Sequence, residues 1–145
     1  MTIKEVKAGL NALLASKYPE IKLYSKAVVE GYKQPCFFTQ IEPITMENRT
    51  KTTRYNLVTF HIGYMQEILD EADILDKVEE IRNLFGQYVK IKDRAVDVTE
   101  FDFDYVGTDR NILEISLDIE WFDKIEHETN EQTMKSLVFL KETEE

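Results

Sequence analysis

The sequence is poor in the residues on which most site chemistry depends. Its 145 residues include one cysteine, two histidines, one tryptophan, five glycines and three prolines. A single cysteine cannot form an internal disulfide, which favours a reducing compartment. The patterns HExxH, CxxC, GxGxxG and the P-loop are all missing, so the common signatures of zinc, dinucleotide and nucleotide sites are missing too. We therefore expect no catalytic residues, no metal and no cofactor.

Long apolar runs and a basic surface are also lacking. No stretch approaches the ~20 apolar residues that a membrane helix needs, and the first ten residues have no signal-peptide core. The net charge of −10 disfavours nucleic-acid binding through phosphate neutralisation. With 43% hydrophobic and 32% charged residues, the composition predicts a soluble, cytosolic globular chain.

The remaining pattern predicts an α+β fold. Thr2 and Glu5 have the spacing of a capping box, which begins a helix that ends at Tyr18 before Pro19. A second helix is predicted over residues 70–85, where Gly86 ends it. Alternation predicts strands over residues 21–25, 36–44, 58–64, 95–106 and 112–123. The order α-β-β-β-α-β-β plus a C-terminal segment favours a mainly antiparallel sheet with both helices packed on one face. We expect a domain over residues 1–124 and an acidic extension over 125–145.

Cys36 is the one candidate nucleophile. A reactive cysteine needs a base and an electropositive setting, and only His61 and His127 could supply an imidazole. Because Cys36 begins an apolar strand and precedes Phe37 and Phe38, the sequence favours a small buried side chain. His61 falls on the polar side of its strand, without a second ligand at metal spacing.

The last predicted hairpin carries an unusual row of charges. If its two apolar rows face one core, and a bulge near Thr99 changes the register, six carboxylates share the opposite face: Glu100, Asp102, Asp104, Glu114, Asp118 and Glu120. Like charges across strands are destabilising, so this face needs an explanation. It could be a solvated surface, a calcium site, a carboxylate pair for acid–base catalysis, or an interface or pore lining. We expect a convex face without a pocket, which disfavours catalysis. The basic side chains of another copy could pair with it: Arg49, Lys51 and Arg54.

Several stretches together resemble a known family. "MTIKEVKAGLNALLASKYPEIKLYS", "EGYKQPCFF", "RYNLVTFHIGY" and the closing hairpin resemble the tail terminator proteins of phages and phage-like elements of Gram-positive bacteria. The likeness runs from Met1 to about Lys124. It implies an α+β domain that forms a homo-oligomeric ring, a hexamer, on the end of a completed tail tube. Such a ring stops tube polymerisation and presents the joining surface for the neck or head. The family has no catalytic residues to assign here.

The resemblance also implies partners and a location. The partners are further copies of the chain, the tail tube protein, and a sheath or neck protein. No membrane and no sequence-specific nucleic acid are implied, although DNA could pass through the lumen. The protein would act in the bacterial cytoplasm during assembly and then remain in the tail of a virion or a headless, bacteriocin-like particle.

An apolar patch interrupts the acidic extension. It consists of Met134, Leu137, Val138, Phe139 and Leu140, which a purely solubilising tail does not need. We expect the patch to dock on a neighbouring copy or the tail tube, or to fold back onto its own domain. Two other functions stay open: a different head–tail completion protein, and a monomeric protein-binding or immunity-type module. An enzyme is the least supported reading.

Overall fold

The computed structural model describes residues 1–25, 34–107 and 112–125. These residues form two helices and six strands: α1 (Ile3–Lys17), β1 (Lys22–Ser25), β2 (Cys36–Asn48), β3 (Thr53–Met65), α2 (Glu71–Phe85), β4 (Tyr88–Ile91), β5 (Arg94–Val106) and β6 (Ile112–Lys124). The predicted α+β class is confirmed. Within the described ranges, neither helix has the length and apolar character to cross a membrane.

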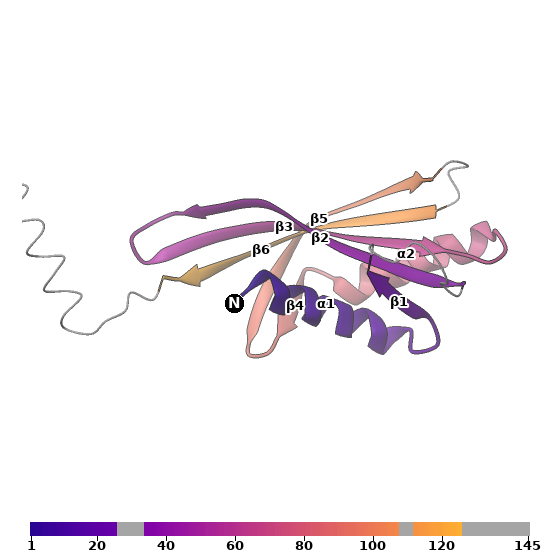
Figure 1. The fold of residues 1–145 in the computed structure, drawn as a ribbon, viewed down its shortest axis with the longest axis horizontal. Coiled ribbons are helices and arrows are strands. Elements are labelled where there is room, and N and C mark those ends of the chain that lie inside the picture. The colour runs from indigo at the N-terminus through magenta and orange to yellow at the C-terminus, as the bar shows by residue number, and fades with distance from the viewer. Residues whose placement is uncertain (26–33, 108–111, 126–145) are drawn as a thin grey trace, which may run out of the picture.

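The six strands form one sheet in the order β1-β2-β3-β6-β5-β4 (Figure 1). Only β1 and β2 run parallel; the other neighbours are antiparallel, as the hairpin pattern predicts. Strand β4, which adds a third strand after α2, was not predicted. At four residues β4 is too short for an alternation to stand out, although Val89 and Ile91 are both buried.

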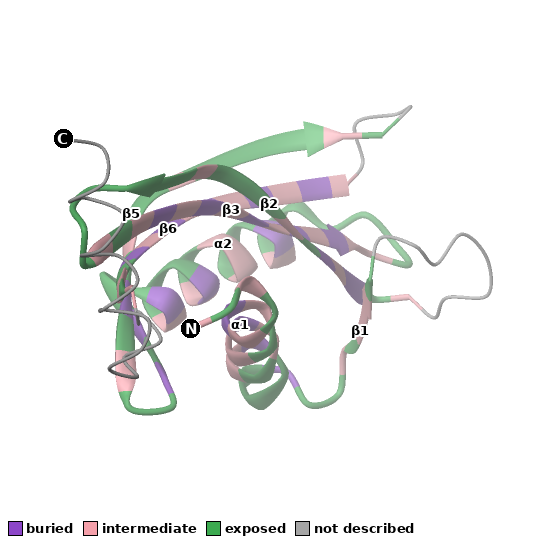
Figure 2. Cartoon of the chain, turned by 60° about the vertical axis from the view of Figure 1, so that its left-hand side comes forward, coloured by how far each residue is buried: buried purple, intermediate pink, exposed green. Residues whose placement is uncertain are grey.

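Both helices pack on one face of the sheet, as expected (Figure 2). On β3 and β6, alternate residues point into a single core, and Phe60 lies 6.2 Å from the Phe85 ring of α2, measured between ring centroids. Val6, Leu10 and Leu14 form the buried stripe of α1. Each such buried side chain contributes about 1.5–3 kcal/mol of transfer free energy.

The predicted helix ends are confirmed. Thr2 precedes α1, and its side-chain oxygen accepts a 3.2 Å hydrogen bond from the Glu5 amide. Asp70 caps α2 by accepting a 3.1 Å bond from the Ala72 amide. Gly86 ends α2 with a φ of +60°, which glycine adopts without steric cost.

The two long hairpins extend away from each other (Figure 1). The turn between β2 and β3 lies at one end of the sheet, while β5 and β6 approach their connection at the other end. Both strands are longer than the predicted ranges 36–44 and 58–64, because β2 continues to Asn48 and β3 begins at Thr53. Pro43 lies at a bulge and in a part of β2 that is an edge strand, since β1 pairs with β2 only as far as Thr39; both are places where sheets tolerate proline.

The apolar row of β5 lies on the helix side of the sheet but is only partly covered. The predicted bulge is confirmed, since the register shifts between Val98 and Glu100. Beyond it, Phe103 is opposite the buried Ile115 and Tyr105 is opposite the buried Leu113. Yet Phe103 is 48% exposed and Tyr105 is 39% exposed, because this end of the hairpin diverges from the helices (Figure 2). The expectation that the whole row enters the core is therefore wrong. On α2, Leu75 has the helical spacing of the apolar face, yet it is exposed as well.

Candidate assembly surfaces

The basic segment forms the tip of the β2–β3 hairpin. The amides of Arg49 and Thr50 both donate to the Thr53 carbonyl, at 2.9 and 3.2 Å, and close the turn. The Arg49 guanidinium pairs with Glu47 at 2.6 Å and lies 4.5 Å from the centre of the Tyr55 ring. The Arg54 side chain donates to the Asn48 side chain at 3.3 Å. Arg49, Lys51 and Arg54 are all exposed, so the tip presents cations whose positions neighbouring side chains help to fix.

Strand register places all six carboxylates of the acidic hairpin on the face away from the helices. Glu100 is opposite Asp118, and Asp104 is opposite Glu114. Glu120 is opposite Asp97, which adds a seventh carboxylate to this face. We call it the acidic face.

Side chains on the neighbouring strand β3 form hydrogen bonds and close contacts with the carboxylates of β6. The Thr59 hydroxyl donates to Asp118 and the Tyr55 hydroxyl donates to Glu120, both at 2.8 Å. The bond to Glu120 is the main reason that the pKa of the Tyr55 hydroxyl is raised. His61 contacts Glu114 at 2.9 Å through one ring nitrogen and Glu42 at 3.1 Å through the other. These bonds hold the β6 half of the acidic face in place.

On the β5 half of the acidic face, neighbouring carboxylates repel one another. The nearby Asp102 carboxylate, followed by Asp118, raises the pKa of the exposed Glu100 carboxyl. Asp104 accepts a 2.8 Å bond from the Tyr105 amide. A cationic partner would relieve this repulsion, so the outer half of β5 is the part of the face best suited to a basic surface.

The acidic face has a hollow, so the expectation of a convex face without a pocket is wrong. A cavity of about 360 Å³ opens over β2, β3 and the first residues of β6. Its apolar lining comes from Phe38, Met65, Val106 and Ile112, and its polar rim includes His61 and Glu114. The sheet is twisted rather than simply convex, which produces this hollow.

The structure confirms that Cys36 is buried. Its side chain has no exposed area, and burial raises the pKa of its thiol. A thiol in this state is a poor nucleophile, because the reactive thiolate form is disfavoured. Over the described residues, no group of three or more histidine, cysteine, aspartate or glutamate side chains is placed to hold a metal ion.

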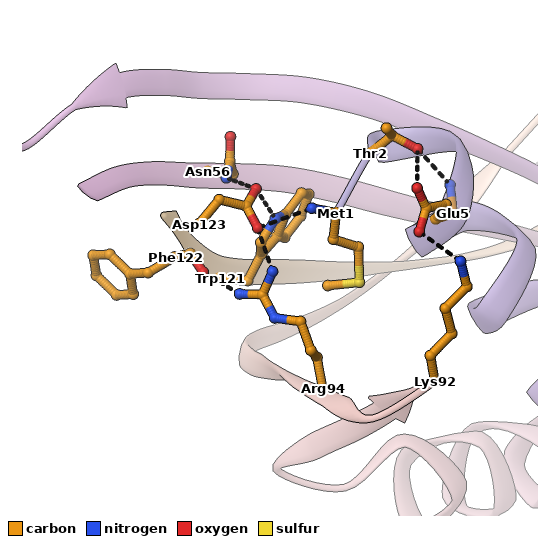
Figure 3. A network of polar contacts seen from close by, with 9 residues as sticks. All are labelled: Met1, Thr2, Glu5, Asn56, Lys92, Arg94, Trp121, Phe122 and Asp123. Carbon is orange, nitrogen blue, oxygen red and sulfur yellow. Dashed lines mark hydrogen bonds and ion pairs between the residues drawn. The ribbon is translucent and has the colours of Figure 1, made fainter. Parts of the chain in front are cut away.

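A polar network near the hairpin tip was not predicted (Figure 3). The Asp123 carboxylate accepts bonds from the Met1 amino group at 3.1 Å, Arg94 at 2.5 Å, and the side chains of Asn56 and Trp121, each at 3.0 Å. Arg94 also donates to the Phe122 carbonyl. Burial pushes the pKa of the Asp123 carboxyl up, but these donors outweigh burial and hold it below its ordinary value.

The Asp123 network joins β3, β5, β6 and the start of the chain. It fixes the base of the basic tip and the residues from which the C-terminal extension departs. The apolar patch of that extension, Met134 to Leu140, lies outside the described residues. The only sequence signal for the network is an acidic residue on the core side of its strand, two positions after Trp121.

The charged and apolar surfaces at the two ends of the sheet are those of a protein that binds other proteins. The domain is a small α+β scaffold whose distinctive features are opposite charges and uncovered apolar side chains at the ends of two long hairpins. A profile of the phage tail terminator protein family matches residues 5–131. The chain therefore belongs to the phage tail terminator family and has a structural role in phage tail assembly, which confirms the resemblance.

Solved structures add a likeness in fold. One solved chain matches with a TM-score of 0.53 and 11% sequence identity, covering 88% of this chain and 98% of the other. At that identity the likeness shows the fold alone. No curated protein matched the sequence.

Proposed function

We propose that the protein caps the end of a tail tube as a homo-oligomeric ring, a hexamer. The ring stops addition of tube subunits and offers the surface on which the neck or head is joined. Its partners are other copies of the chain, the tail tube protein, and a sheath or neck protein. DNA passes through the lumen without sequence-specific contacts. The protein acts in the bacterial cytoplasm and stays in the finished tail, in a virion or a headless particle.

One observation carries this proposal: the two ends of the sheet differ in charge. The β2–β3 tip presents Arg49, Lys51 and Arg54, while the outer half of the β5–β6 hairpin presents Asp102, Asp104 and Glu114. A ring needs two different patches that meet head to tail. Opposite charges at opposite ends favour contacts between unlike patches of two copies, since each patch repels its own kind.

The interface can be tested by reversing the charge of the tip. Arg49, Lys51 and Arg54 are replaced together by Glu, and the tail tube protein of the same phage or phage-like element is polymerised with each chain. We expect the unaltered chain to shorten and narrow the distribution of tube lengths seen by negative-stain electron microscopy. The triple variant should fold but leave the tubes as long as they are without any cap.

A matched control reverses three exposed cations elsewhere. Lys4, Lys17 and Lys90 lie on α1 and β4, away from the tip, so their replacement by Glu gives the same change in net charge. This control should cap tubes normally. If the tip variant also caps normally, the tip is a solvated turn and the proposed contact is wrong. If the unaltered chain binds its partner as a monomer and never limits tube length, the ring proposal itself fails.

A further inference from the structure

An apolar groove lies at the end of the sheet that carries the acidic hairpin. It is lined by Leu69, Glu71, Ile74 and Tyr105 and has a volume of about 520 Å³. Leu69 is 65% exposed, and Phe103 lies beside Tyr105 on the same face of β5. We call the groove together with Phe103 the end groove. Exposed aromatic and aliphatic side chains gathered in this way mark a contact surface.

The rim of the end groove is negatively charged. Glu71 is part of its lining, and the exposed Asp70 precedes it in the chain. On β5, Asp102 and Asp104 lie on the other face of the strand from Phe103 and Tyr105. A partner for this groove should therefore bring apolar side chains flanked by cations.

The β2–β3 tip has this composition. Met46 is 56% exposed and lies on the helix side of the sheet, where it is opposite the buried Asn56. Ile44, at the bulge of β2, is 52% exposed. The cations Arg49 and Arg54 follow within the same hairpin end.

We propose that the β2–β3 tip of one copy docks in the end groove of the next copy. Met46 and Ile44 cover Leu69, Phe103 and Tyr105, while the arginines of the tip meet the carboxylates at the rim. The contact rests on the proposed ring and specifies its subunit interface. Because tip and groove lie at opposite ends of one sheet, a chain cannot fill its own groove with its own tip (Figure 1).

The C-terminal extension is the rival occupant. It leaves the domain at Ile125, whose amide donates to the Thr52 carbonyl at 2.8 Å, so it starts beside the tip. Tyr105 is opposite Leu113, about twelve residues back along β6, which corresponds to roughly 40 Å at ~3.3 Å per residue. The nine residues to Met134 span at most about 32 Å when fully extended. Met134 therefore falls short of the groove of its own chain, while Leu137 and Leu140, twelve and fifteen residues from Ile125, span at most about 43 and 54 Å. The extension would fill its own groove only in a largely extended form, which favours the tip of a second copy.

Cysteine pairing tests the contact directly. One full-length chain carries Met46→Cys and a second carries Tyr105→Cys; the natural Cys36 is buried and should not react. The two chains are mixed at high concentration, oxidised, and separated by non-reducing electrophoresis. We expect the mixed disulfide to exceed either same-variant disulfide several-fold, and to decrease as added salt screens the charged rim.

Two control mixtures make the result specific. Tyr88→Cys replaces another exposed aromatic, on β4, and should not pair with Met46→Cys. Leu137→Cys reports on the rival: its preferential pairing with Tyr105→Cys, either within one chain that carries both substitutions or between two chains, would overturn the proposal. So would equal yields of mixed and same-variant disulfides. If solution mass shows a ring but the Met46–Tyr105 disulfide does not form, this contact is rejected and the ring is not. If the disulfide forms but the chain does not cap tubes, the proposed function is rejected and the contact is not.

Discussion

The Asp123 network offers the sharpest test of how the basic tip is held. We predict that Asp123→Asn lowers the free energy of unfolding by about 2–3 kcal/mol. The substitution removes the charge that pairs with the Met1 amino group; the Asp123 side chain is 15% exposed, and the Met1 side chain beside it is 3% exposed. A buried hydrogen bond to a charged group contributes roughly 1.5–3 kcal/mol. Arg94 is 39% exposed, so water screens its pair and we count it at no more than ~1 kcal/mol.

The loss should be visible in thermal unfolding of the untagged chain. For a domain of this size, 1 kcal/mol corresponds to roughly 3–4 °C, so calorimetry at pH 7 should show a decrease in Tm of about 6–12 °C. Asp76→Asn is the matched control, because Asp76 is exposed on α2. It should change the Tm by less than ~2 °C, the effect of about 0.5 kcal/mol typical of a surface substitution.

The pH dependence has a definite sign. The pKa of the Asp123 carboxyl is lower in the folded chain than in the unfolded chain. The stabilisation is therefore fully present above the unfolded value of about 3.9 and is lost as the pH falls through the folded value. The Tm difference between the natural chain and Asp123→Asn should be constant from pH 7 to about pH 5 and shrink below about pH 4. A difference below ~0.5 kcal/mol at pH 7, or one that grows in acid, would refute this account of the network.

Three further predictions concern other parts of the chain. Cys36→Ser should cost about 1–3 kcal/mol in unfolding free energy, because it places a hydroxyl in a buried apolar site, and tube capping should persist; lost capping by a folded variant would contradict the structural role. Asp102→Asn should lower the pKa of the Glu100 carboxyl toward its ordinary value, as measured by NMR titration, and an unchanged pKa would mean that Asp102 is not the source of the shift. Deleting residues 130–145 should leave the monomer Tm unchanged and abolish assembly, because we expect the apolar patch of the extension to dock on a neighbouring copy or the tail tube outside the end groove; a large decrease in Tm would show that the extension folds back onto its own domain.

The fold could be predicted because its local signals agree. The capping box at Thr2, the start of the second helix near residue 70 and the terminating Gly86 lie where the structure has them. The bulge after Val98 was visible as a change of phase among the apolar residues of β5. By contrast, β4 and the strand ends that form the tip were missed. A strand of four residues is too short for its alternation of apolar and polar residues to stand out, and the polar strand ends at a hairpin turn show no such alternation.

The candidate surfaces were only half visible in the sequence. Alternation shows which face of a strand a residue occupies, and it placed the six carboxylates correctly. It cannot show whether anything covers that face, so Phe103 and Tyr105 looked like core residues. The Asp123 network could not be predicted from the sequence either. Its donors come from β3, β5, β6 and the first residue, and only the folded sheet brings them together.

Both uncovered apolar surfaces depend on a β-bulge. On β5, the extra residue near Thr99 turns Phe103 and Tyr105 to the helix side; without it they would share a face with Glu120. On β2, the shift between Pro43 and Thr45 does the same for Met46, which would otherwise lie opposite Tyr55 on the acidic face. A one-residue change of register moves every later side chain to the other face. The two bulges thus place apolar side chains on the helix side at both ends of the sheet, beyond the part that the two helices cover, and leave them open to a partner.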